Sequence, residues 1–181
     1  MFFPLIVLDI DSSGLEFINA LESEITILHQ VEYYQVGWLK SQSPMLIAPL
    51  DGRACAQQVD DVFFGVHQDY PTNVLALKAF DVNGDGVIDA QDPSYDHLYL
   101  WLDHNKDGEC TPNEVIPISA FGITIHLDFE RVFDMTEEHH IINYSFTFDI
   151  DFINHRGEHI QTDGLKGWDV ALHSILPTDN Q

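Results

Sequence analysis

Residues 81–92 read Asp-Val-Asn-Gly-Asp-Gly-Val-Ile-Asp-Ala-Gln-Asp, and residues 103–114 read Asp-His-Asn-Lys-Asp-Gly-Glu-Cys-Thr-Pro-Asn-Glu. In both stretches, positions 1, 3 and 5 carry short side chains with an oxygen atom, position 6 is glycine and position 12 is a carboxylate. Ca2+ is a hard cation that binds about six to eight oxygen atoms, and the glycine allows the chain to turn sharply around the ion. The two stretches therefore predict two calcium loops.

Each loop offers a defined set of candidate ligands. Positions 1, 3, 5 and 12 would bind through side chains, position 7 through its backbone carbonyl, and position 9 directly or through water. The candidates are Asp81, Asn83, Asp85, Val87, Asp89 and Asp92 in the first loop, and Asp103, Asn105, Asp107, Glu109, Thr111 and Glu114 in the second. Asp92 is one methylene shorter than Glu114, so we expect the first site to be the weaker, or the more tolerant of Mg2+. The alternative is a pair of solvated turns, because Asp, Asn and Gly are also common turn residues.

Composition predicts one compact domain over residues 1–181, because 45% of the chain is hydrophobic. Thirty acidic residues against seven basic ones give a net charge of −23, which opposes binding to nucleic acid or to anionic membranes. No apolar run is long enough to span a membrane. The first eight residues lack a basic segment and a cleavage site, so they predict a strand and no signal peptide. Localisation stays open between the cytoplasm and export by a route that needs no signal peptide.

The two cysteines, Cys55 and Cys110, fit no zinc motif. Cys110 is at position 8 of the second loop, where a small apolar side chain would face Ile88, its counterpart in the first loop. We expect a buried thiol at this position in preference to a disulfide.

Periodicity gives the expected elements. Short apolar runs predict strands at residues 5–10, 25–28, 36–39 and 45–48. The apolar run at 98–102 favours a buried strand, with the end of a short helix that begins at Pro93 as the alternative. Thr72 would cap a short helix that continues through Phe80, residues 59–64 would form a helical turn, and the second loop would lead into short helices that stop near Pro117 and at Gly122.

The last third of the chain is more regular. Apolar and polar residues alternate over 123–130 and over 142–152, which predicts two antiparallel strands joined by the acidic segment 134–140. Trp168, Leu172 and Ile175 would share one face of a terminal helix over 166–176. The fold class expected from these elements is α+β, with short antiparallel strands and short helices packed around a paired calcium-loop motif.

The order of short motifs along the chain carries a family resemblance. The motifs are Pro4–Asp11, Gly37–Leu39, Phe63–Gly65, the loop at 81–92, residues 98–108 and Phe121–Ile123. This arrangement resembles the calcium-binding self-processing module of bacterial iron-regulated RTX proteins, most closely between about residues 74 and 127. The resemblance implies an EF-hand-like domain that binds several Ca2+ ions and folds when it does so.

The resemblance also implies a reaction, because modules of this kind cut their own chain at an Asp-Pro bond just ahead of the first strand. The matching bond here is Phe3–Pro4. Phenylalanine has no carboxylate to attack its own backbone carbonyl, so we expect no self-cleavage at this bond. Residues 29–34 and 49–60 stand where the family has further metal loops but hold few ligand oxygens, and residues 9–20 begin like a loop and lack a closing carboxylate.

Three functions follow from these observations. The first is a calcium-binding domain in which the ion has a structural or sensory role. The second is a calcium-dependent autoproteolytic or transpeptidase module that acts on a bond supplied from elsewhere, and the third is an acidic interaction protein that binds a secreted bacterial protein. The ten histidines lack zinc-site spacing, and His139 and His140 are expected to be solvated in a polar loop.

Overall fold

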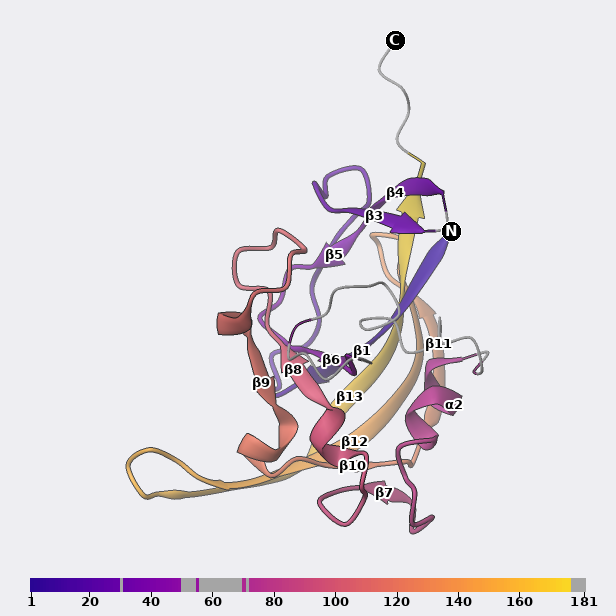
Figure 1. Cartoon of the computed structure of the whole chain (residues 1–181). Helices are drawn as coiled ribbons and strands as arrows, with labels where there is room; N and C mark the ends of the chain where they lie inside the picture. The colour runs from indigo at the N-terminus through magenta and orange to yellow at the C-terminus, as the bar shows by residue number, and fades with distance from the viewer. Residues whose placement is uncertain (30, 50–54, 56–69, 71, 177–181) are drawn as a thin grey trace.

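One large antiparallel sheet dominates the structure. The computed structural model describes residues 1–29, 31–49, 55, 70 and 72–176. Within this part, eleven strands join in the order β7-β10-β12-β13-β1-β6-β8-β9, with β11 beside β12 and the β3–β4 hairpin attached to β13 (Figure 1). A separate pair joins β2 and β5. The strands are β1 (Phe2–Asp9), β2 (Phe17–Ile18), β3 (Thr26–His29), β4 (Glu32–Val36), β5 (Trp38–Leu39), β6 (Met45–Ile47), β7 (Val87–Ile88), β8 (Tyr99–Trp101), β9 (Val115–Pro117), β10 (Thr124–His126), β11 (Glu130–Met135), β12 (Ile141–Ile153) and β13 (His159–Ile175).

Helical structure is sparse in the described residues. The α-helix α2 (Asn73–Lys78) begins at Thr72, whose side chain accepts a hydrogen bond of 3.2 Å from the backbone N–H of Leu75, as the sequence predicts. The other helical segments are 3-10 turns at Tyr95–His97, Pro112–Glu114 and Ile118–Phe121. The last of these ends at Gly122 in the left-handed conformation, with φ of 51°, which confirms the predicted cap.

The expected α+β fold class is therefore wrong, because strands and not helices flank the second loop. Strand β8 runs into this loop, and β9 follows it after a single 3-10 turn, so the predicted helix up to Pro117 is also wrong. The connection over 134–140 is shorter than expected, because strand β11 pairs with β12 across a bulge between Arg131 and Asp134.

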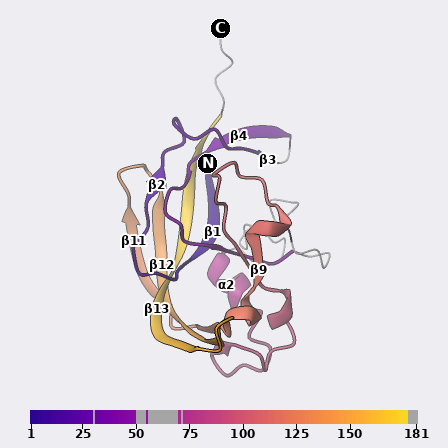
Figure 2. The same cartoon turned by 90° about the vertical axis from the view of Figure 1, so that its left-hand side faces the viewer.

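The predicted terminal helix over 166–176 is a strand instead. Strand β13 pairs with β12, β1 and β4, and it runs beside β12 along one side of the molecule (Figure 2). Residues 169–172 are all buried, so the two-residue alternation that marks a strand is absent there. Burial on both faces of the sheet explains why the apolar spacing also fitted a helix.

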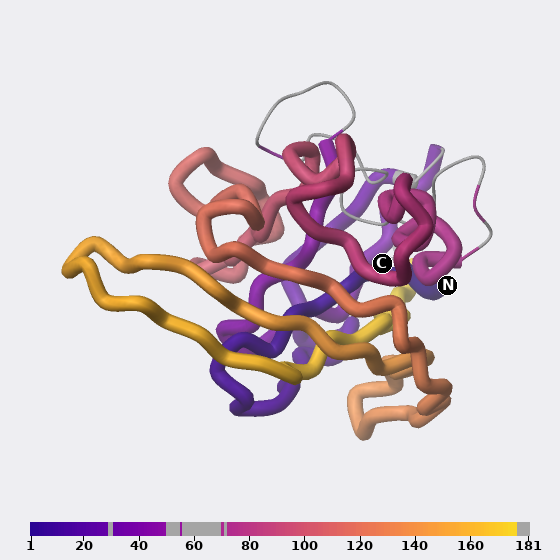
Figure 3. The backbone as a smooth tube through the Cα atoms, turned by 90° about the horizontal axis from the view of Figure 1, so that it is seen from below, coloured from indigo at the N-terminus to yellow at the C-terminus, as the bar shows by residue number. Residues whose placement is uncertain are grey.

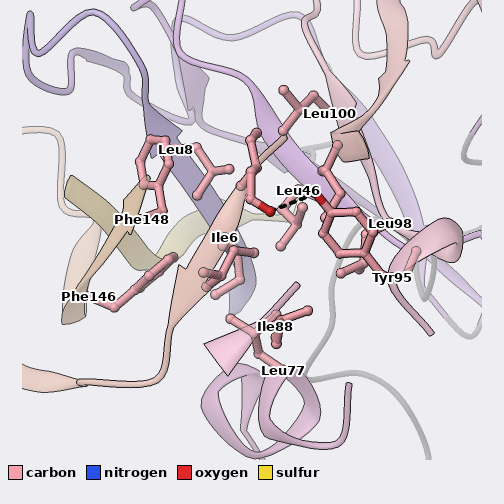
Figure 4. Packing of buried hydrophobic residues seen from close by; sticks show 14 of the residues in the cluster. Ile6, Leu8, Leu46, Leu77, Ile88, Tyr95, Leu98, Leu100, Phe146 and Phe148 are labelled. Carbon is pink, nitrogen blue, oxygen red and sulfur yellow. Dashed lines mark hydrogen bonds between the residues drawn. The ribbon is translucent and has the colours of Figure 1, made fainter. Parts of the chain in front are cut away.

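Strand β1 lies at the centre of the sheet, and its alternate residues serve two cores. Ile6 and Leu8 pack with Phe146 and Phe148 on one face, where Leu77 of α2 also packs (Figure 4). The other face holds a second core that includes Leu5, Val7, Trp38, Met45 and Trp101. Both faces of β1 are therefore covered, which accounts for its uninterrupted apolar sequence.

The predicted strands at 5–10, 25–28, 45–48, 98–102 and 142–152 are confirmed in type, with shifted ends. The predicted strands at 36–39 and 123–130 are each interrupted, at Gly37 and at residues 127–129. The predicted helical turn at 59–64 lies outside the described residues. The long β12–β13 hairpin extends beyond the rest of the molecule (Figure 3). Among the helices that the structure describes, none is long and apolar enough to cross a membrane.

Candidate metal-binding loops

The first loop is closed by hydrogen bonds from its own backbone. The Asp81 carboxylate accepts from the N–H groups of Gly84, Asp85 and Gly86 at 2.7, 3.2 and 3.0 Å. The Asn83 side chain accepts from the Asp85 N–H at 2.9 Å. Gly84 and Gly86 have φ of 76° and 91°, a conformation that disfavours other residues, so the glycines permit this tight turn.

Asp92, the residue at position 12, holds the two ends of the first loop together. Its Oδ1 accepts from the N–H groups of Val82 at 2.8 Å and Asn83 at 3.2 Å, and its Oδ2 accepts from the N–H of Asp89 at 3.1 Å. The side chain is buried. Asp92 therefore ties the start of the first loop to its end.

The second loop repeats much of this pattern. Asp103 accepts from the N–H groups of Asp107 at 3.2 Å and Gly108 at 2.9 Å, as Asp81 does from the same loop positions. Asn105 accepts from Asp107 at 3.3 Å, and Asp107 accepts from the N–H of Glu109 at 2.8 Å, which matches Asp85 accepting from Val87 at 3.1 Å in the first loop. The repetition shows that the two stretches share one loop conformation.

Glu114 shares only part of the role of Asp92: within the described residues it accepts hydrogen bonds from position 9 of its loop, whereas Asp92 also accepts from positions 2 and 3. The Oε2 of Glu114 accepts from the backbone N–H of Thr111 at 3.1 Å and from the Thr111 hydroxyl at 3.0 Å. These contacts also cap the 3-10 turn Pro112–Glu114. The closing carboxylate is thus held at a fixed position before the chain enters β9.

The two loops differ in their surroundings. The second loop packs against the N-terminal part of the chain: the indole Nε1 of Trp38 donates a hydrogen bond of 2.8 Å to Asp103, and the Lys106 ammonium donates one of 2.8 Å to the Ser41 carbonyl. Burial lowers the pKa of Lys106. The first loop instead pairs with β10 through β7, and the N–H of Leu127, the residue after β10, donates to the Gly86 carbonyl at 3.0 Å.

The loops do not pair with each other, contrary to the expectation. Ile88, at position 8 of the first loop, lies opposite Ile125 of β10. Cys110, at position 8 of the second loop, forms a disulfide with Cys55, and their Cα atoms are 5.6 Å apart. The predicted free thiol is therefore wrong, because the residue that faces Cys110 comes from another part of the chain.

Within the described residues, no three side chains of His, Cys, Asp and Glu converge as a metal centre. The donor set is nevertheless all oxygen and includes amide and backbone oxygens, which suits a hard cation. Asp92, Asp103 and Glu114 are only 3%, 1% and 9% exposed. Among the described residues, no lysine or arginine forms an ion pair with these carboxylates. Buried negative charge is unfavourable unless it is compensated, and the Lys106 ammonium interacts electrostatically with Asp103 alone among these three carboxylates. The oxygen-rich loops therefore fit a bound cation.

Other predicted features have different outcomes. Asp9 begins a similar turn, since its Oδ2 accepts from the Gly14 N–H at 3.0 Å, and burial raises its pKa. His140 is completely buried and not solvated as expected. The segment at 29–34 forms part of the β3–β4 hairpin, in which His29 lies opposite Glu32. Residues 30, 50–54 and 56–60 lie outside the described part of the chain.

The chain belongs to the SPM domain family, whose sequence profile matches residues 6–162. It is also similar to the iron-regulated protein FrpA of Neisseria meningitidis serogroup C, with 26% identity over 131 residues. That match covers 65% of this chain and 11% of the relative, so the chain spans about a tenth of the length of that protein. The resemblance to iron-regulated proteins is thus confirmed at the level of family.

Proposed function

We propose that this protein is a calcium-binding domain of the RTX type, with one Ca2+ ion in each of the loops at 81–92 and 103–114. The observation that carries the proposal is the repeated loop conformation, in which equivalent oxygen-bearing side chains accept equivalent backbone hydrogen bonds. Solvated turns would not need to match at four separate positions, nor to bury their closing carboxylates.

The role proposed for the ion is structural or sensory. A bound Ca2+ would supply positive charge to the carboxylates of each loop in a chain whose net charge is −23. The chain contributes the fixed loop: Asp81 and Asp103 hold its turn, and Asp92 and Glu114 hold its end. A ligand that binds only the folded state stabilises it, by about 2.7 kcal/mol per site at one hundred times Kd.

Calorimetric titration of metal-stripped protein with Ca2+ tests this proposal directly. We expect two bound ions per chain, and a large rise in melting temperature when Ca2+ is added. The Asp81→Ala, Asp103→Ala double variant should lose both effects. Asp96→Asn is the matched control, because Asp96 is an exposed acid between the loops that accepts none of their closing hydrogen bonds. A double variant that still gains stability from millimolar Ca2+ as the parent does would show that the ion binds elsewhere.

The proposed domain does not cut its own chain at the bond that matches the family reaction. Phe3 has no nucleophilic group, and its side chain is buried in the core. The Phe3–Pro4 bond lies inside β1, opposite Leu172 and Ala171 of β13. The bond is therefore held in a regular strand that is paired on this side with β13.

A further inference from the structure

Trp38 joins the second loop to the interior of the protein. Its indole Nε1 donates a hydrogen bond of 2.8 Å to Oδ2 of Asp103, which lies 65 residues later in the chain. The two side chains are only 2% and 1% exposed. A hydrogen bond from a neutral donor to a carboxylate is among the stronger kinds in proteins, and exclusion of water strengthens it further.

The backbone around Trp38 is held on several sides. Trp38 pairs with Ile18 across the small β2–β5 sheet, and the N–H of the preceding Gly37 donates to the His173 carbonyl of β13 at 2.9 Å. Gly37 also lies against the His140 ring so closely that a side chain would not fit. The indole therefore reaches Asp103 from a support that cannot easily move.

This contact fixes one oxygen of Asp103. Oδ2 accepts from both the Trp38 indole and the Gly108 N–H, while Oδ1 accepts only a longer hydrogen bond of 3.2 Å from Asp107. The carboxylate plane is thereby set, and Oδ1 remains as the less engaged oxygen. Within the described residues, Asp81 at the same position of the first loop accepts only from N–H groups of its own loop.

We propose that the Trp38 indole is a positioning group for the second calcium loop, one that orients the Asp103 carboxylate before the ion binds and makes this loop the tighter site. This inference rests on the proposed calcium function. Preorganisation raises affinity because the carboxylate does not have to be ordered when the ion arrives. Within the described residues, the Asp81 carboxylate of the first loop is held by N–H groups of its own loop and receives no such contact from the rest of the chain.

Trp38→Phe tests the inference, since it keeps an aromatic ring and removes the N–H. In calorimetry, we expect the tighter of the two Ca2+ steps to weaken about tenfold or more, with the weaker step unchanged. Trp101→Phe is the matched control. Trp101 is as buried as Trp38 and packs edge-on against it, with 5.8 Å between the ring centroids. Its Nε1 has no hydrogen-bond partner among the described residues. Unchanged binding in Trp38→Phe, or equal weakening in both variants, would overturn the inference.

A spectroscopic measurement tests the same contact with the Trp38 side chain in place. In the Asp81→Ala protein, which retains the second loop, the indole N–H resonance of Trp38 should shift on addition of Ca2+ while those of Trp101 and Trp168 stay in place. A Trp38 resonance that does not move while Ca2+ binds would contradict the positioning role.

Asp103→Asn separates failure of this inference from failure of the proposed function. If Asp103→Asn abolishes the tighter step and Trp38→Phe has no effect, the loop binds Ca2+ and only the role of Trp38 is wrong. If Asp103→Asn leaves the titration unchanged, the second loop is not a calcium site, and the inference falls with it.

Discussion

The Asn73 side chain donates a hydrogen bond of 2.8 Å to the Asp169 carboxylate, which joins α2 to β13 in the interior. Burial raises the pKa of Asp169 to about 6, and the Asn73 hydrogen bond only partly offsets that effect. The folded state therefore binds this proton more tightly than the unfolded chain. The stability that the proton provides is present at low pH and is lost as the pH rises through about 6.

Asp169→Asn should consequently be more stable than the parent at pH 8, by about 2–3 kcal/mol, because it removes a buried charge. The difference should shrink as the pH falls towards 4. Urea unfolding at several pH values measures both effects, with Asp163→Asn as the control for an exposed acid on the same strand. A pH-independent difference would show that the carboxylate titrates normally.

His140 should lower the stability of the protein in acid, whereas the protonated Asp169 raises it. Its Nε2 lies 3.1 Å from the Ile18 carbonyl, and its Nδ1 accepts a hydrogen bond of 2.9 Å from the His173 N–H, so the neutral ring satisfies both contacts. Burial lowers the pKa of His140. The unfolded chain then binds this proton more readily, and stability should fall as the pH drops below about 6.5.

The test for His140 compares unfolding of the parent, His140→Gln and His155→Gln between pH 5 and 7. Glutamine keeps a donor and an acceptor and does not titrate, so His140→Gln should show a weaker pH dependence. His155→Gln, which changes an exposed histidine, should behave as the parent does. Identical pH profiles for all three proteins would rule out His140 as the titrating group.

The disulfide between Cys55 and Cys110 should stabilise the protein through the chain that it closes, since its ends are 55 residues apart. We expect the Cys55→Ser, Cys110→Ser double variant to be less stable by about 2–4 kcal/mol. The parent should drop to a similar unfolding midpoint when it is reduced, and the variant should not respond to the reductant. A reductant effect of equal size on both proteins would indicate another cause.

The different closing residues, Asp92 and Glu114, predict that the two loops bind Ca2+ with different affinities. Glu114→Gln should remove the tighter Ca2+ step, and Asp92→Asn should remove the weaker one, because the longer carboxylate can bind through both oxygens. Calorimetry of the two variants distinguishes the steps. Equal losses from both substitutions would mean that the loops bind as one cooperative unit.

The chain should stay whole in Ca2+, because Phe3 replaces the acid that the family reaction requires. Intact-mass measurement over a day at neutral pH should show one species with or without Ca2+. A fragment that forms only with Ca2+ would restore the autoproteolytic function as the better explanation.

Local spacing determined which features could be predicted from sequence. Strand β12 alternates between apolar and polar residues, and the loop ligands follow one another within twelve positions, so both are visible as patterns. The apolar spacing in β13 predicts a helix, because burial on both faces removes the alternation of a strand. The Trp38–Asp103 and Cys55–Cys110 contacts join residues 65 and 55 positions apart, and no local pattern encodes such a pair.

The pairing of β1 with β13, from Phe2 opposite His173 to Asp9 opposite Lys166, sets the order of events during synthesis. A ribosome releases β1 long before β13, so one edge of the central strand stays uncovered until the later strand has been made. Pairings so distant in sequence form slowly. During that interval, the apolar residues Leu5–Leu8 are open to association with other chains. A chain shortened ahead of β13 would retain this hazard permanently.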